Sequence, residues 1–121
     1  MSEILLMSDE IRIINPLTGG EKGSKLARFD LIPVNALYEL ARVYGKGAEK
    51  YAPRNWERGY EWGLSYAALH RHLVAFWGGE ELDPETGLSH LAHAAWHCFT
   101  LFEFTKTQRA LDTRQEKRVE T

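Results

Sequence analysis

All five histidines of the chain lie between residues 70 and 97, on either side of a short acidic segment. His90, His93 and His97 recur at intervals of three and four residues, so they share one face if this region is helical. His70 and His72 are two residues apart, so at most one of them can point toward any given partner. Imidazole and carboxylate groups held close together are suited to binding a divalent cation and to general acid–base catalysis.

The acidic segment, residues 80–87, is the main candidate for metal ligation. Carboxylate oxygens favour Mg²⁺, and neighbouring imidazoles move the preference toward Mn²⁺, Zn²⁺ or similar ions. The alternative is structural: the histidines are hydrogen-bonded and the acidic segment is only a solvated loop. The sequence has no His-Glu-x-x-His motif, which excludes a zincin-type zinc site, and no adjacent His-Asp pair, which argues against a phosphohydrolase of the His-Asp class. The expected metal ligands are Glu80, Asp83, Glu85, His90 and His93, and the catalytic candidates are Glu80, Asp83, Glu85 and His90.

A second group of side chains is basic and aromatic. Glycine-rich backbone, lysines and arginines are suited to phosphate oxygens, and an aromatic ring can stack on a base. The glycine-rich stretch lacks the spacing of a P-loop. The alternative is that these residues are surface lysines and core aromatics, and Trp62 is a further stacking candidate. The expected substrate-binding residues are Lys25, Arg28, Lys50, Tyr51, Arg54, Asn55, Trp56 and Arg71.

Apolar residues at helical spacing predict three helices that would position these groups. The first opens at Pro33, and Gly45 and Gly47 end or bend it. The second covers about residues 61–77 and stops at two glycines, and the third covers about residues 89–111 with Ser89 or Thr86 as its N-cap. Because a short connection makes the last two helices antiparallel neighbours, the acidic segment should lie where they meet.

The rest of the chain is assigned from its composition. Residues 1–14 predict a short strand or a loose arm, and residues 15–25, with three glycines and a proline, predict a loop. The expected fold is all-α, a small antiparallel helical bundle with a short β element at the N-terminus as an option. We expect a single helical domain over residues 1–111, in which 1–24 form an arm and glycine-rich loop, and a charged tail over 112–121.

Composition limits the classes of partner. The chain has 121 residues, 44% of them hydrophobic, and a net charge of −2, which disfavours intrinsic disorder and a nucleic-acid polymer as partner. Its early apolar run, residues 4–7, is too short to span a membrane, so we expect a cytoplasmic protein without a membrane partner. Cys98 is expected to be a small buried hydrophobe. Four tryptophans and the apolar third helix predict a homo-oligomer, a dimer or a dimer of dimers.

Four segments of the chain resemble a known family. They are residues 25–33, residues 50–56, Arg71-His72 and residues 79–96, in the same order and at similar spacing over about residues 20–105. This pattern is similar to the phage-associated family described as dATP/dGTP diphosphohydrolase, N-terminal. The resemblance implies hydrolysis of a purine deoxynucleoside triphosphate to the monophosphate and pyrophosphate with Mg²⁺ or Mn²⁺. It also implies kinship with all-α, MazG-like nucleotide pyrophosphohydrolases, and a host-cytoplasm location if the protein is phage-encoded.

The sequence departs from the MazG-like pattern at the metal ligands. Those enzymes carry a Glu-x-x-Glu helix and a Glu-x-x-Asp helix; here Glu80 to Asp83 fits only the second motif, and no Glu-x-x-Glu occurs. One reading is therefore an enzyme, in which the acids and histidines hold a metal and a carboxylate or His90 accepts a proton. The second is a non-catalytic phage protein that sequesters a signalling nucleotide. The third is a helical adaptor whose histidine–acid cluster is structural.

Overall fold

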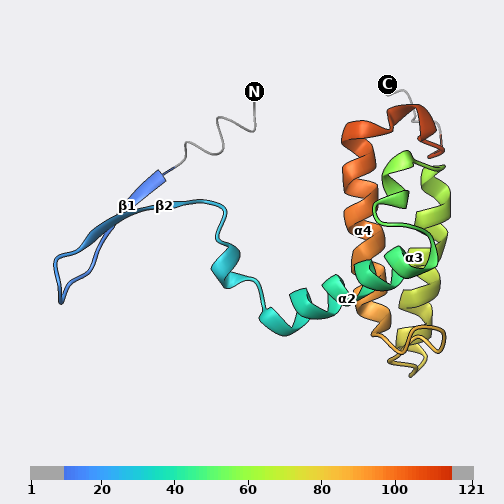
Figure 1. Ribbon diagram of the computed structural model, residues 1–121, viewed down its shortest axis with the longest axis horizontal. Helices are drawn as coiled ribbons and strands as arrows, with labels where there is room; N and C mark the ends of the chain where they lie inside the picture. The colour runs from blue at the N-terminus through green and yellow to red at the C-terminus, as the bar shows by residue number, and fades with distance from the viewer. Residues whose placement is uncertain (1–9, 116–121) are drawn as a thin grey trace. The chain divides into compact units, whose positions relative to one another are not determined.

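The computed structural model describes residues 10–115. The chain divides into two compact units, Met1–Pro33 and Val34–Thr121, each with its own contacts. Figure 1 shows strands in the first unit and the long helices in the second. Among the described residues, none of the helices combines the length and the apolar character that crossing a membrane requires.

The first unit is built on a β-hairpin. Strand β1 (Glu10–Ile14) pairs antiparallel with β2 (Glu21–Lys25), and Glu10 lies opposite Lys25. The turn is closed by Asn15, whose side-chain oxygen accepts the N–H groups of residues 17 and 18, and Gly19 adopts φ 75°. The strand option is thus confirmed for residues 10–14, whereas residues 1–9 lie outside the described part of the chain. The loop prediction for residues 15–25 is wrong over β2, because pairing with β1 supplies the backbone partners that local composition does not reveal.

The second unit holds three α-helices. They are α2 (Val34–Lys50), α3 (Trp62–Trp77) and α4 (His90–Thr107), with short 3₁₀ turns at Asn55–Arg58 and Arg109–Leu111. A third such turn, Phe29–Leu31, belongs to the first unit. α3 packs along α4, and α2 packs on α4 at fewer positions. The all-α prediction is confirmed in its coarse form, since the chain is mostly helical, and the β element expected as an option is a two-stranded sheet.

Two predicted helix ends need correction. α2 continues through Gly45 and Gly47 to Lys50. A glycine inside a helix costs only about 1 kcal/mol, and the buried side chains of Leu40 and Val43 hold the helix in place. α4 ends at Thr107 instead of residue 111, and the chain continues as a 3₁₀ turn.

The tightest packing lies where α4 meets the start of α3. The side chain of Phe104 is fully buried, and its ring contacts those of Trp56 and Tyr60. Trp62 is 4% exposed, and its indole N–H donates to the backbone oxygen of Gln108 at 3.0 Å. Cys98 was predicted to be buried and is exposed. The apolar face of α4 is wider than the area that α2 and α3 cover, so the sector with Cys98 stays open.

Candidate functional site

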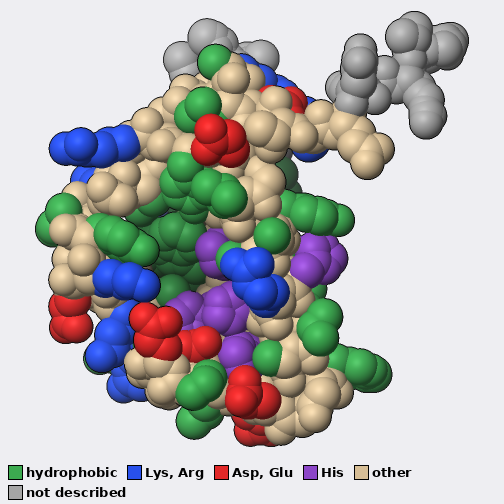
Figure 2. All heavy atoms as spheres, turned by 90° about the vertical axis from the view of Figure 1, so that its right-hand side faces the viewer, with side chains coloured by type: hydrophobic (Ala, Val, Ile, Leu, Met, Phe, Trp, Pro, Cys, Tyr) green, Lys and Arg blue, Asp and Glu red, His purple; other side chains and the backbone are tan. Residues whose placement is uncertain are grey.

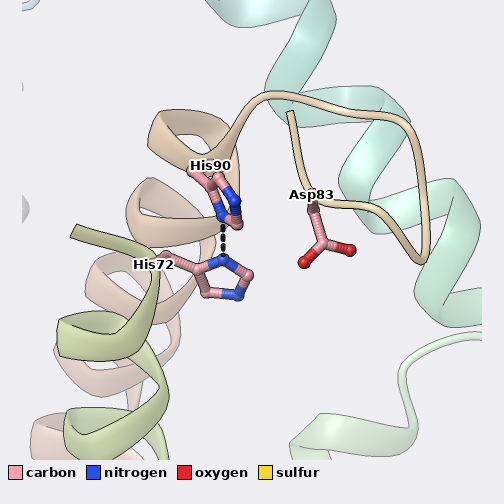
Figure 3. A group of neighbouring side chains, drawn as sticks. All are labelled: His72, Asp83 and His90. Atoms are coloured by element: carbon pink, nitrogen blue, oxygen red, sulfur yellow. Dashed lines mark hydrogen bonds between the residues drawn. The ribbon is translucent and has the colours of Figure 1, made fainter. Parts of the chain in front are cut away.

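The loop between α3 and α4 brings two histidines and a carboxylate together. His72 comes from α3, His90 begins α4, and Asp83 comes from the loop (Figure 3). The Nδ1 atoms of His72 and His90 are 2.8 Å apart, and one ligand atom from each of the three residues lies within 4.8 Å of the others. Figure 3 shows the carboxylate of Asp83 aimed at the space beside the two rings.

Backbone hydrogen bonds fix the carboxylate of Asp83. Its Oδ2 accepts the N–H groups of Glu85 and Thr86, both at 3.0 Å, and the N–H of Gly87 donates to its backbone oxygen at 2.7 Å. Gly87 adopts φ 74°, a conformation that favours glycine, so the turn can close on itself. Burial alone would raise the pKa of Asp83, but the Thr86 N–H and the nearby His93 outweigh it, and the pKa is lowered. The site therefore presents an ionised, oriented carboxylate.

His90 is almost fully buried, with 3% of its surface exposed, and both ring nitrogens have partners. Nε2 lies 2.8 Å from Oε1 of Glu80, and Nδ1 meets His72. An ionised carboxylate only accepts hydrogen bonds, so Nε2–H of His90 donates to Glu80. In a neutral ring Nδ1 then carries the lone pair, and Nδ1–H of His72 donates to it. With a neutral His90 ring, the order of donation runs from His72 through His90 to Glu80.

The other histidines of α4 complete the cluster. The rings of His93 and His72 are stacked, with centroids 4.6 Å apart and planes 6° apart, and His97 stacks on His72 at 5.9 Å. Nε2 of His93 lies 2.7 Å from the hydroxyl of Thr86. The predicted common face of the three α4 histidines is confirmed, because all of them contact His72. His70 lies elsewhere, against the ring of Tyr66.

Burial sets the protonation of these rings. It lowers the pKa of His72, where the neighbouring His93 lowers it further. Burial also lowers the pKa of His93, although Asp83 opposes the shift. The pKa of His97 falls to about 4, through burial first and then through repulsion by His72. These imidazoles are therefore neutral at neutral pH, which leaves their nitrogen lone pairs available.

The predicted phosphate ligands are only partly brought together. Nζ of Lys50 lies 3.4 Å from Glu85, which raises the pKa of the lysine and places it against the acidic loop. Arg71 is exposed and directly precedes His72 on α3, and its charge adds to the effects of burial and the neighbouring histidines that lower the pKa of His72 and His97. Tyr51 is exposed beside Lys50.

The remaining predicted ligands have other surroundings. Arg54, with φ 62°, pairs with Glu57 at 2.8 Å, and Asn55 begins the 3₁₀ turn that carries Trp56. Trp56 packs on Phe104, and Trp62 is too deeply buried to stack on a ligand. Lys25 and Arg28 belong to the first unit, where they pair with Glu10 and Asp30.

Two site residues were missed by the sequence reasoning. His72 was known only as one of two alternatives with His70, and choosing between them requires the rotation of α3 about its axis. Glu39 of α2 accepts the N–H of Ser89 at 3.0 Å, and its charge acts on His93. Little in the sequence singles out Glu39, because it is a single acidic residue far from the loop in sequence, and several other acidic residues of the chain fit that description equally well.

The arrangement offers ligands for a cation beside a recess. Two imidazoles and one carboxylate suit Mn²⁺, Fe²⁺ or Zn²⁺ better than Mg²⁺. Figure 2 shows histidine side chains gathered on one face, acidic side chains next to them, and a hollow with hydrophobic side chains directly beside them.

Comparison with known proteins places this geometry in a family context. The model of a family described as "dATP/dGTP diphosphohydrolase, N-terminal" matches residues 16–114, a range that contains the cluster. A curated protein of Salmonella phage PMBT28, named dATP/dGTP diphosphohydrolase, is 31% identical over 99 residues. The match covers 82% of this chain and 34% of that protein, so the chain spans about a third of the relative's length. No solved structure matches the chain.

Proposed function

The chain belongs to the dATP/dGTP diphosphohydrolase N-terminal family, and from this premise we propose that it is a metal-dependent nucleotide pyrophosphohydrolase. Its substrates are purine (deoxy)nucleoside triphosphates, which it converts to the monophosphate and pyrophosphate. The name of the phage relative supports the substrate class. The observation that carries the proposal is the convergence of His72, Asp83 and His90 within the matched region.

The residues present fit a divalent cation. Nitrogen and carboxylate ligand atoms lie within 4.8 Å of one another, and the hydrogen bond from His90 to Glu80 is the kind of outer contact that orients metal-binding histidines. His72, Asp83 and His90 would hold the ion, whose binding would replace the hydrogen bond between the two rings because a ligating lone pair cannot also accept a proton. When bound, the ion supplies Lewis-acid polarisation of a phosphoryl oxygen.

The chain's own side chains hold the phosphates and accept the proton. Lys50 pairs with Glu85 of the acidic loop, Arg71 directly precedes His72 on α3, and both side chains can donate to phosphate oxygens. We do not assign the role of general base to His90, because both of its ring nitrogens have partners inside the protein. We assign that role to one of the exposed carboxylates, Glu80 or Glu85, each of which keeps an oxygen free of the contacts described.

A nucleotide panel tests this function. Purified protein is incubated with purine and pyrimidine nucleoside triphosphates and with cyclic nucleotides, in Mg²⁺, Mn²⁺ or EDTA, and the products are identified by chromatography and mass spectrometry. We expect a nucleoside monophosphate and pyrophosphate from purine triphosphates, with no product in EDTA. Recovery of only intact, bound nucleotide under every metal condition would overturn hydrolysis and support the sequestering protein instead.

A further inference from the structure

A row of aromatic rings leads from the histidine cluster toward α2. The ring centroid of His97 lies 5.9 Å from that of His72, and the ring of Trp96 lies edge-on to His97 at 4.9 Å. Trp96 in turn meets Tyr44 of α2 at 5.8 Å. The rings therefore form a continuous aromatic wall that begins at the candidate metal ligands.

This wall remains open to solvent. Trp96, Tyr44 and His97 are each only half-buried. α2 and α3 both pack on α4 but touch each other at most slightly. The hollow beside the histidines in Figure 2 agrees with this arrangement, and hydrophobic side chains are visible inside it. Partly exposed rings beside such a hollow are suited to an aromatic ligand, which would cover them.

Polar groups stand next to the rings. Ser65 is fully buried, and its hydroxyl lies 2.6 Å from that of Tyr60 and 2.9 Å from Nδ1 of His97. Within residues 10–115, the buried side-chain polar atom without a partner is the hydroxyl of Thr100, so the other ring nitrogen of His97 is not a buried orphan. That nitrogen, Nε2, can meet a ligand. A few fixed polar groups in an apolar recess are what ligand sites use for orientation.

From these observations we propose that the hollow beside the histidines is the nucleobase subsite, in which the base stacks on Trp96 and its polar edge meets His97. The inference rests on the proposed function, since it assumes that the phosphates lie at the histidine–acid cluster. It moves base recognition from Trp56 and Trp62 to Trp96, because Trp96 adjoins His97 of the cluster, whereas Trp62 is buried and the ring of Trp56 lies against Phe104. A purine presents more ring area than a pyrimidine to such a platform.

The test separates the base from the phosphates. Calorimetry measures binding of the α,β-methylene analogue of dATP, which resists the proposed cleavage, and of inorganic triphosphate, which has no base. We expect Trp96→Leu to weaken binding of the analogue roughly 5- to 150-fold, since stacking on an aromatic side chain contributes about 1–3 kcal/mol per base. Binding of inorganic triphosphate should stay within about twofold. The matched control is Trp77→Leu, because Trp77 is 88% exposed at the end of α3, and it should change neither ligand.

A more conservative variant keeps the test informative if Trp96→Leu does not fold. Trp96→Phe keeps an aromatic platform, so affinity should persist while the quenching of tryptophan fluorescence by the analogue disappears. Equal weakening of both ligands in Trp96→Leu, or quenching that persists in Trp96→Phe, would overturn the subsite. If dATP is hydrolysed and Trp96→Leu leaves analogue affinity unchanged, the subsite fails and the hydrolase stands. If the analogue binds through Trp96 but no metal supports hydrolysis, the hydrolase fails and the subsite stands.

Discussion

The two ends of the α3–α4 pair differ in the kind of side chain that they bury. At the loop end, imidazoles and carboxylates are crowded together, and His90 is buried with its polar ring. At the other end Phe104 is fully buried, and the indole N–H of Trp62 donates a hydrogen bond to the backbone oxygen of Gln108. The first end is built from groups that are costly to bury unless each has a partner, and the second from apolar area that stabilises on its own. We therefore expect the polar end to carry the proposed function and the packed end to supply most of the stability.

The side chains of the polar end are held by partners from several elements. His72 is supplied by α3, Glu39 by α2 and Asp83 by the loop. The N–H of His90 also donates to the backbone oxygen of Glu81 at 2.9 Å, which fastens the start of α4 to the loop. A site assembled in this way loses its geometry when one ligand is changed, while the packed end keeps the helices together.

The largest effect on stability is expected at the packed end. Phe104→Ala should lower the free energy of unfolding by about 3–5 kcal/mol, because it removes a fully buried ring and leaves a cavity. Thermal unfolding followed by circular dichroism measures the change. Phe102→Ala, two residues along on the exposed side of α4, is the control and should cost less than about 1 kcal/mol. Similar losses in both variants would mean that the packed end is not the stabilising one.

At the polar end the expected effect is on turnover. Asp83→Asn should reduce hydrolysis at least about 100-fold, more than the loss of an outer partner of a metal site usually causes. Its melting temperature should stay close to that of the unchanged protein, because the amide oxygen still accepts the N–H groups of Glu85 and Thr86. Asp112→Asn makes the same change outside the site and should leave turnover unaltered. Full activity in Asp83→Asn would remove this carboxylate from the proposed mechanism.

Much of the helical frame could be predicted from the sequence. α3 ends at Trp77, directly before the two glycines, and the Ser89 side chain caps α4 by accepting the N–H of Leu91. These features depend on residues close together in the chain, so local rules reach them. β2 was not predicted, because its partner strand and not its composition makes it a strand.

The candidate site also depends on contacts between distant parts of the chain, which local sequence rules do not predict. The shared face of the three α4 histidines follows from their spacing alone, whereas the choice of His72 over His70 depends on how α3 is rotated against α4. The exposed position of Cys98 likewise depends on which sector of α4 its neighbours leave uncovered. Trp62, Tyr66 and Phe102 border a cavity of about 730 Å³ in that region. The homo-oligomer predicted from the apolar third helix stays a prediction.

A subtler change at the polar end should affect the metal and not the fold. Glu80→Gln keeps an oxygen for Nε2–H of His90 but removes the charge that orients and strengthens the ring as a ligand. We expect the affinity for Mn²⁺ to fall about 10- to 100-fold, as measured by calorimetric titration. Glu81→Gln is the matched control, because the Glu81 contact with His90 is made by its backbone oxygen. Equal Mn²⁺ affinity in both variants would show that Glu80 has no part in metal binding.

The smallest expected effect is a loss of stability from a change at the packed end. Trp62→Phe keeps an apolar ring but removes the indole N–H, so the backbone oxygen of Gln108 loses its 3.0 Å hydrogen bond. A lost hydrogen bond of this kind lowers the free energy of unfolding by about 1 kcal/mol, which for a domain of this size shifts the melting temperature by about 4–8 °C. Turnover per folded molecule should not change, because Trp62 is 4% exposed and lies at the end of α3 away from the loop. Trp77→Phe, at the exposed end of the same helix, should leave both quantities unchanged. A loss of turnover in Trp62→Phe larger than its loss of folded protein would show that the packed end reaches the site, and the division of labour between the two ends would be wrong.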